Sequence, residues 1–170
     1  MARLNLQMAD FDTALEFYQQ SASLAQHAQH DAMAARALIH TVMVALRAYA
    51  QGYIPPVLQP PALRPQLAQA LATLQRTAPS HTKAYDLINA GLASAQLRPY
   101  LPETAPDLER QAAEVFLEAA TVAQTLHNQQ AASYAWGHLG HLYEDAQRYP
   151  EALHLTQRAI FAAQQVQADR

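Results

Sequence analysis

Cysteine is absent from this 170-residue chain, lysine occurs once, and only 4 residues are glycine. Without cysteine the chain can form no disulfide, carry no catalytic thiolate and build no Cys-based metal site. The formal net charge is −3 and the isoelectric point is near 6.2. Because no basic face is available to neutralise many phosphates, we expect no nucleic-acid partner.

Long apolar runs are also missing. A membrane-spanning helix needs about 20 consecutive apolar residues, and no segment approaches that length, so we expect no membrane span. Met1 is followed at once by an ordinary helical sequence and not by a signal peptide. The sequence therefore predicts a cytoplasmic location.

The chain lacks the patterns of strands and of common catalytic sites. β-branched residues never alternate, whereas Ala, Leu and Gln, all good helix formers, dominate. Without strands there is no strand–turn–helix elbow for a nucleophilic serine, and no Gly-rich phosphate loop is present. Carboxylates pair only as surface neighbours, such as Glu144 with Asp145. We predict an all-α fold, with one domain of sizeable core, no cofactor and no enzymatic activity.

What the chain does contain is clearest between residues 133 and 164. Four residues fall at i, i+3, i+4 and i+7, on one face of a helix. A polar turn follows, then Pro150, which the first turn of a helix tolerates, and then a second apolar stripe. Small residues on both stripes let two helix axes approach closely, which predicts a tight antiparallel pair. The first stripe is Trp136, Leu139, Gly140 and Tyr143, and the second is Ala152, Leu155, Ala159 and Ala163.

This spacing, W-x-x-L-G-x-x-Y followed by two alanines, resembles a tetratricopeptide repeat (TPR). Two positions depart from the family pattern: Gln147 stands where a turn glycine is usual, and Thr156 where an aromatic residue is common. The resemblance implies antiparallel helix pairs stacked as a right-handed superhelix. The matching residues are Trp136, Leu139, Gly140, Tyr143, Tyr149, Ala152 and Ala159.

The same pattern, more weakly kept, extends over the rest of the chain as about 3.5 to 4 repeats. In the repeat before the last, Leu87, Ala90 and Gly91 take the Trp, Leu and Gly positions, and Ala112, Phe116 and Ala119 those of the second helix. Two Pro-rich insertions, 53–61 and 97–107, interrupt the middle repeats and are not expected to be helical. The predicted repeats are approximately 1–30, 31–78, 80–128 and 131–167.

The first repeat is incomplete by this reading. We expect a helix over Met1–Met8, a turn at Ala9 and Asp10, and a second helix over Phe11–Ala28. The chain would then open in the middle of a repeat, as part of a longer array does. The alternative is that a short first helix caps the domain.

Helix ends are predicted from capping residues. We expect Asp31 and Ser80 to be N-caps, and Thr104 or Asp107 to cap the helix that follows the second insertion. Gly52 and Asn128 are expected to end helices in the left-handed conformation.

A narrower resemblance comes from the phrases ASYAWGHLGHLYE and EALHLTQRAIFAAQ, preceded by SHTKAYDLINAGLAS. They are similar to the N-terminal TPR regions of bacterial, often cyanobacterial, CHAT-domain proteins, in which a caspase-like peptidase domain follows the repeats. Such a peptidase needs a His and a Cys nucleophile. Since this chain has no Cys, no peptidase residue can be carried over.

The TPR resemblance implies a concave groove lined by the first helix of each pair. A groove of this composition suits an extended peptide or a partner helix, so we expect a protein–protein interaction module, a scaffold or adaptor. With one lysine, Lys83, it does not resemble the Lys/Arg-rich clamp that holds a C-terminal carboxylate. The implied groove residues are Tyr134, Gly137, His141, Glu144, Asp145, Tyr85, Ile88, His40 and Arg47, with Val44 and Leu92 beside them.

Two alternative functions stay open. An all-α metal- or ligand-binding bundle could use His138, His141 and Glu144, although residues at this spacing on one helix need further ligands from another segment, and we expect no metal site. Apolar faces left bare on the end helices could instead pair two chains in a homodimer.

Overall fold

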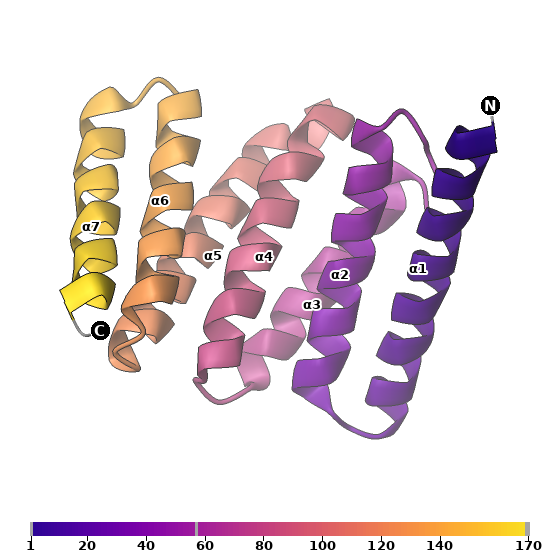
Figure 1. The fold of residues 1–170 in the computed structure, drawn as a ribbon, viewed down its shortest axis with the longest axis horizontal. Helices are drawn as coiled ribbons and strands as arrows, with labels where there is room; N and C mark the ends of the chain where they lie inside the picture. Colours follow the sequence, from indigo (N-terminus) through magenta and orange to yellow (C-terminus); the bar gives the residue numbers. More distant parts are fainter. Residues whose placement is uncertain (1, 57, 169–170) are drawn as a thin grey trace. The chain divides into compact units, whose positions relative to one another are not determined.

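The computed structural model describes residues 2–56 and 58–168, and the side chains of 10–56 and 58–167. Within these residues all regular structure is helical and no strand is present, which confirms the all-α prediction (Figure 1). The α-helices are α1 (Ala2–His27), α2 (Asp31–Ala50), α3 (Pro60–Arg76), α4 (His81–Leu97), α5 (Ala105–Thr125), α6 (Gln129–Asp145) and α7 (Tyr149–Ala168), and two 3₁₀ turns, η1 (Arg98–Tyr100) and η2 (Pro102–Thr104), lie between α4 and α5.

The chain divides into two compact units. The first contains the residues up to Thr77 together with Pro99–Pro102, and the second contains Ala78–Arg98 and the residues from Glu103 onward. The prediction that all repeats stack as a single array concerns how the units are joined, and it stays a prediction.

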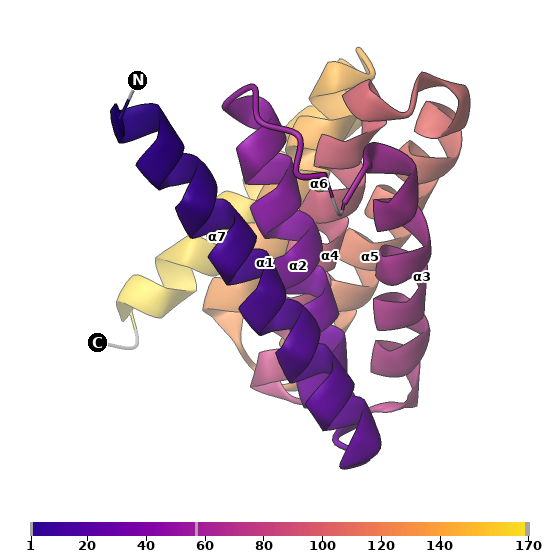
Figure 2. The same ribbon diagram turned by 90° about the vertical axis from the view of Figure 1, so that its right-hand side faces the viewer.

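Helix α2 is the centre of the first unit because it packs against both α1 and α3. Figure 1 and Figure 2 both show α1 running alongside α2. On α2 the apolar residues Ile39, Val42 and Leu46 are buried, and α3 contributes the buried Leu63 and Leu67. Removing such side chains from water is the main favourable contribution to the stability of this unit.

The turn predicted at Ala9 and Asp10 is wrong. Helix α1 runs without interruption from Ala2 to His27. Neither Gly nor Pro occurs in this stretch, and a helix that has been nucleated propagates through residues such as Ala unless one of them breaks it. Met1, the first residue of the expected short helix, lies outside the described residues.

In the first Pro-rich segment, predicted over 53–61, the described residues up to Gln59 are non-helical, whereas Pro60 and Pro61 already form the first turn of α3. The Tyr49 hydroxyl donates a hydrogen bond to the Leu58 carbonyl oxygen (2.6 Å) and so ties the segment to α2. Burial, with a smaller effect of the neighbouring Tyr100, raises the pKa of Tyr49 to about 12. This phenol therefore remains a hydrogen-bond donor throughout the physiological pH range.

In the second unit, successive helices α4 to α7 pack against one another and α4 also contacts α6. Ser80 is the N-cap of α4, as predicted, and its side chain accepts a hydrogen bond from the Lys83 amide (3.0 Å). The second Pro-rich segment, 97–107, was expected to be non-helical, and this prediction is wrong. Leu97 is the last residue of α4, the two 3₁₀ turns follow, and α5 already begins at Ala105, because proline is tolerated in the first turn of a helix. Thr104 precedes α5 without a side-chain capping bond, and Asp107 lies in the first turn, where a negative charge is favourable.

Three helix–helix turns share one geometry. Gln29, His127 and Gln147 all have positive φ, at 56°, 53° and 59°. In each turn the next amide donates to the carbonyl oxygen five residues earlier, as His30 does to Ala25 (2.8 Å). This is the Schellman motif, in which a left-handed residue lets the last carbonyls of a helix find partners. Gln147 thus adopts the conformation for which a glycine was expected.

Two predicted helix ends are corrected. His127, not Asn128, takes the left-handed conformation, while the Asn128 side chain caps α6 by accepting from the Ala131 amide (3.0 Å). Asp31 is not an N-cap, because α2 begins at Asp31 itself and His30 precedes it. The Asp31 carboxylate lies in the first turn, where it meets Arg76 at 3.4 Å.

No helix in the described part of the chain is both long enough and apolar enough to cross a membrane.

Gln147→Gly should raise the free energy of unfolding by about 1 kcal/mol. The left-handed conformation costs an L-residue about 1–2 kcal/mol, and the greater freedom of glycine in the unfolded chain offsets part of the gain. Because Gln147 is exposed, no packing changes with it. Urea denaturation measures the effect.

The matched control is Ala146→Gly, at a neighbouring exposed position with φ of −79°, where glycine should lower stability. Equal destabilisation by both variants would contradict the assignment of Gln147 to a left-handed turn.

Candidate functional site

Helices α6 and α7 form a tight antiparallel pair, as the sequence predicts. A Cβ atom on Gly140 would lie 3.1 Å from Thr156 Oγ1 and 3.4 Å from the Ala152 carbonyl oxygen, so only glycine leaves both helices this close without adjustment. Trp136 and Leu139 of the predicted stripe are buried, with 5% and 1% of their surface exposed.

On α7 the stripe is confirmed in part. Ala152, Leu155 and Ala159 are buried, whereas Ala163 is exposed and Ala162 is buried in its place. The shift follows from the helical period, because the contact face drifts by one position over several turns.

Helices α4 and α5 repeat this arrangement. A Cβ atom on Gly91 would lie 2.6 Å from Cε1 of Phe116, so Gly91 meets Phe116 as Gly140 meets Thr156. These are the residues that the repeat pattern makes equivalent. The second unit therefore contains the same helix-pair geometry twice, with a longer connection in the first pair.

Helix α6 packs against both α4 and α5 and lies in the groove between them. The His138 ring stacks on Phe116, with ring centroids 5.6 Å apart. At one end of the helix the Asn128 side-chain nitrogen lies 3.0 Å from His81 Nδ1. Because Asn128 and His81 both lie at the N-terminal ends of their helices, α6 and α4 point in the same direction.

Arg98 fixes the other end of α6. Its guanidinium bridges Glu109 of α5 (3.0 Å) and Asp145 of α6 (3.3 Å). Eight residues of α4 and α5 take the positions that are equivalent to the lining of the corresponding groove in the last pair. Tyr85 and Asn89 are half-buried, and the other six are buried: Ala84, Ile88, Phe116, Ala119, Ala120 and Ala123.

The equivalent groove between α6 and α7 is open. It forms a shallow pocket of about 300 Å³, and Tyr134 and Ile160 on its walls are 48% and 52% exposed. We call it the α6–α7 groove. Its lining residues are Ser133, Tyr134, Gly137, His138, Thr156, Ala159, Ile160 and Ala163.

Of the five groove residues predicted on α6, two line this pocket, Tyr134 and Gly137. The other three, His141, Glu144 and Asp145, are exposed at the C-terminal end of the helix and do not line it. His141 Nδ1 lies 3.4 Å from the Asp145 carboxylate, which Arg98 also contacts.

The remaining predicted residues divide between the units. On α4, Tyr85 is half-buried, whereas Ile88 has only 4% of its surface exposed and so offers little surface to a partner. On α2, the His40 ring stacks on Tyr18 at 5.2 Å, and Arg47 is exposed. Val44 and Leu92, the two positions beside these residues, are both half-buried.

The arrangement does not favour the metal-binding alternative. In the part of the chain that the structure describes, no group of three or more His, Cys, Asp or Glu side chains could hold a metal ion. His138 stacks on Phe116, and burial, with a smaller effect of the nearby His141, lowers the pKa of its imidazole. His138 is therefore neutral at neutral pH and adds no charge to the α6–α7 groove.

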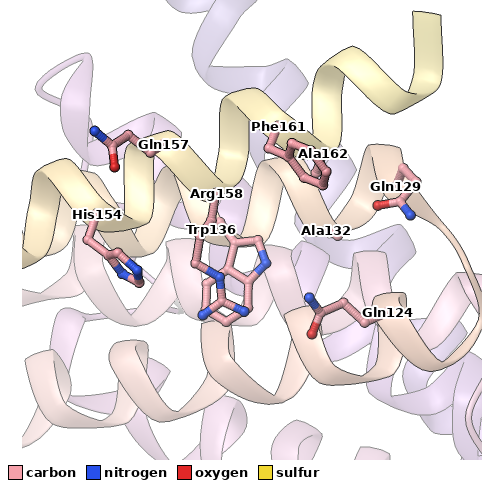
Figure 3. A pocket seen from close by; sticks show the side chains of 9 residues that line it. All are labelled: Gln124, Gln129, Ala132, Trp136, His154, Gln157, Arg158, Phe161 and Ala162. Carbon is pink, nitrogen blue, oxygen red and sulfur yellow. The ribbon is translucent and has the colours of Figure 1, made fainter. Parts of the chain in front are cut away.

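A second pocket, of about 470 Å³, lies where α5, α6 and α7 meet (Figure 3). Its central feature is the Arg158 guanidinium, whose Cζ atom is 3.5 Å from the centroid of the Trp136 ring. We call it the Trp136–Arg158 pocket. This pocket was not predicted from the sequence, because Trp136 was assigned to the core and no spacing rule links it to an arginine on the next helix.

Six lining residues of the α6–α7 groove were also not predicted as groove residues: Ser133, His138, Thr156, Ala159, Ile160 and Ala163. For Thr156, Ile160 and Ala163 the repeat register contains a signal, since these residues correspond to Phe116, Ala120 and Ala123 in the preceding pair.

Comparison with known protein families and with characterised proteins finds no match to the chain.

Gly91→Ala should lower the free energy of unfolding by about 1–3 kcal/mol, because the new methyl group meets a buried aromatic ring that has no room to move. Thermal or urea unfolding measures the loss.

Gly137→Ala is the matched control. The nearest atom to its new Cβ is Ala159 Cβ at 3.9 Å, which is ordinary contact, and alanine favours a helix by up to about 1 kcal/mol over glycine. A Gly91→Ala protein as stable as Gly137→Ala would disprove the tight α4–α5 contact.

Proposed function

We propose that this chain is a non-catalytic helical-repeat module of the tetratricopeptide type, which binds a helical segment of another protein in the α6–α7 groove. One observation supports the proposal above all. The equivalent groove of the preceding helix pair is filled by a helix, α6, whereas the α6–α7 groove is open.

The lining of the groove suits such an occupant. Gly137, Ala159 and Ala163 are small, so a helix axis can approach closely. Tyr134 and Ile160 stand exposed beside them and offer apolar surface to an amphipathic helix. Among the described lining residues none carries a formal charge at neutral pH, because His138 is neutral. The occupant would therefore present an apolar face with small side chains at its centre.

The resemblance to TPR regions of CHAT-domain proteins extends this proposal. A right-handed superhelix of such pairs would present a curved recognition surface. In a protein of that kind the module would recognise or restrain a partner on behalf of a separate peptidase domain.

A photo-crosslinking residue at Ile160 should capture a partner covalently in the native cell, and the captured segment should be an amphipathic helix. A synthetic peptide of that segment should bind the intact chain, and Ala163→Trp, at an exposed lining residue of the groove, should weaken binding at least about tenfold. Fluorescence anisotropy of the labelled peptide measures the affinity.

Leu153→Trp is the control, since Leu153 is a 60% exposed residue of α7 that does not line the groove. Equal capture from position 153, or equal loss of binding in both tryptophan variants, would rule out the groove as the binding site.

Self-association is the second candidate, and exposed apolar residues on α7 favour it. Leu153, Ile160 and Phe161 are 60%, 52% and 63% exposed. A second copy of the chain could cover this surface.

If the chain self-associates through α7, sedimentation velocity at rising concentration should show dimers, and Ile160→Asp should weaken them at least about tenfold. Leu117→Asp, at a 43% exposed residue of α5, should leave them unchanged. A wild-type monomer at all concentrations would exclude this candidate.

A further inference from the structure

The Trp136–Arg158 pocket shares no lining residue with the α6–α7 groove. Figure 3 shows Arg158 of α7 reaching over Trp136 of α6, with Gln124 of α5 beside them. The pocket volume of about 470 Å³ is within the range of small-ligand sites. Its lining residues are Gln124, Gln129, Ala132, Trp136, His154, Gln157, Arg158, Phe161 and Ala162.

Arg158 differs from other arginines of the chain. In the part of the chain that the structure describes, its guanidinium stacks on Trp136 but makes no ion pair and no hydrogen bond. The N–H groups at the edge of the guanidinium plane are therefore available to a ligand. By contrast, four other arginines each meet a carboxylate: Arg76, Arg98, Arg110 and Arg148.

The stacking also holds the guanidinium in place. Trp136 is 5% exposed, so its indole is a fixed surface, and a guanidinium is attracted to an aromatic face without using its edge donors. A pre-positioned guanidinium loses less conformational entropy when it binds a planar anion with two parallel hydrogen bonds.

The other lining residues fit an anion of moderate size. None of the nine described lining residues is acidic, so Arg158 gives the pocket a positive charge. Gln124, Gln129 and Gln157 supply carboxamides that can donate hydrogen bonds. Phe161 is 63% exposed and provides an apolar wall.

We propose that the Trp136–Arg158 pocket binds a peptide carboxylate next to an apolar side chain. Arg158 takes the carboxylate through paired N–H donors, the glutamine carboxamides bond the peptide groups, and Phe161 covers the apolar side chain. Arg158 is the one Lys or Arg among the nine described lining residues, and its single charge matches a carboxylate better than a phosphate group, which carries a charge of about −1.5 to −2.

The test uses the intact chain and acetylated dipeptides. Trp136 is the only tryptophan, so its indole N–H gives a single NMR signal inside the pocket. Acetyl-Leu-Leu with a free carboxylate should shift this signal in a saturable manner at concentrations up to about 10 mM, and its C-terminal amide should not. Acetyl-Leu-Glu-amide tests the other source of a carboxylate, an acidic side chain.

Arg158→Gln should weaken carboxylate binding at least about tenfold. Phe161→Ser should also weaken binding, because it removes the apolar wall while the Arg158 guanidinium stays in place. Arg148→Gln is the matched control, because Arg148 also stacks on an aromatic ring, Tyr143 at 4.3 Å, but does not line the pocket.

Saturable binding of either carboxylate peptide, lost in Arg158→Gln and kept in Arg148→Gln, supports the proposal and identifies the source. Equal binding of the amide, or no shift with either carboxylate, overturns it. The comparison of acid and amide on the wild-type chain decides the question even if Arg158→Gln does not fold.

Discussion

The close approach of two helices at a glycine is the contact on which the second unit depends. Gly91 lies against the Phe116 ring, and Gly140 lies against Thr156 and the Ala152 carbonyl. Because each first helix lacks a side chain at that point, each second helix can lie directly against it. The short distance between the two helices of each pair determines the shape of the groove beside them. It therefore also determines where α6 lies in the groove of the first pair.

The two grooves differ because of what covers them. Helix α6 seals the α4–α5 groove with the His138–Phe116 stack, and Arg98 fixes its end through Glu109 and Asp145. In the α6–α7 groove, Thr156 stands where the repeat pattern places an aromatic residue. A smaller and more polar side chain therefore lies at the point where Phe116 lies in the preceding pair.

Three of the turns between helices place a residue other than glycine in the left-handed conformation. Gln29, His127 and Gln147 take the left-handed conformation at three turns, and each costs some stability. The hydrogen bonds of the Schellman motif and the packing of the paired helices offset that cost. This explains how a chain with 4 glycines still forms short, regular connections.

The sequence by itself determined the helical fold, most of the first Pro-rich interruption, the cap at Ser80 and the tight pair around Gly140, because these depend on local propensity and on residue spacing. It failed at Ala9 and Asp10, since a pattern match cannot outweigh helix propagation. Only the tertiary structure decided that Ile88 is buried, that the groove beside Tyr134 and Gly137 is open, and that Arg158 stacks on Trp136. These properties depend on which helices meet across long sequence separations, and no local pattern encodes that.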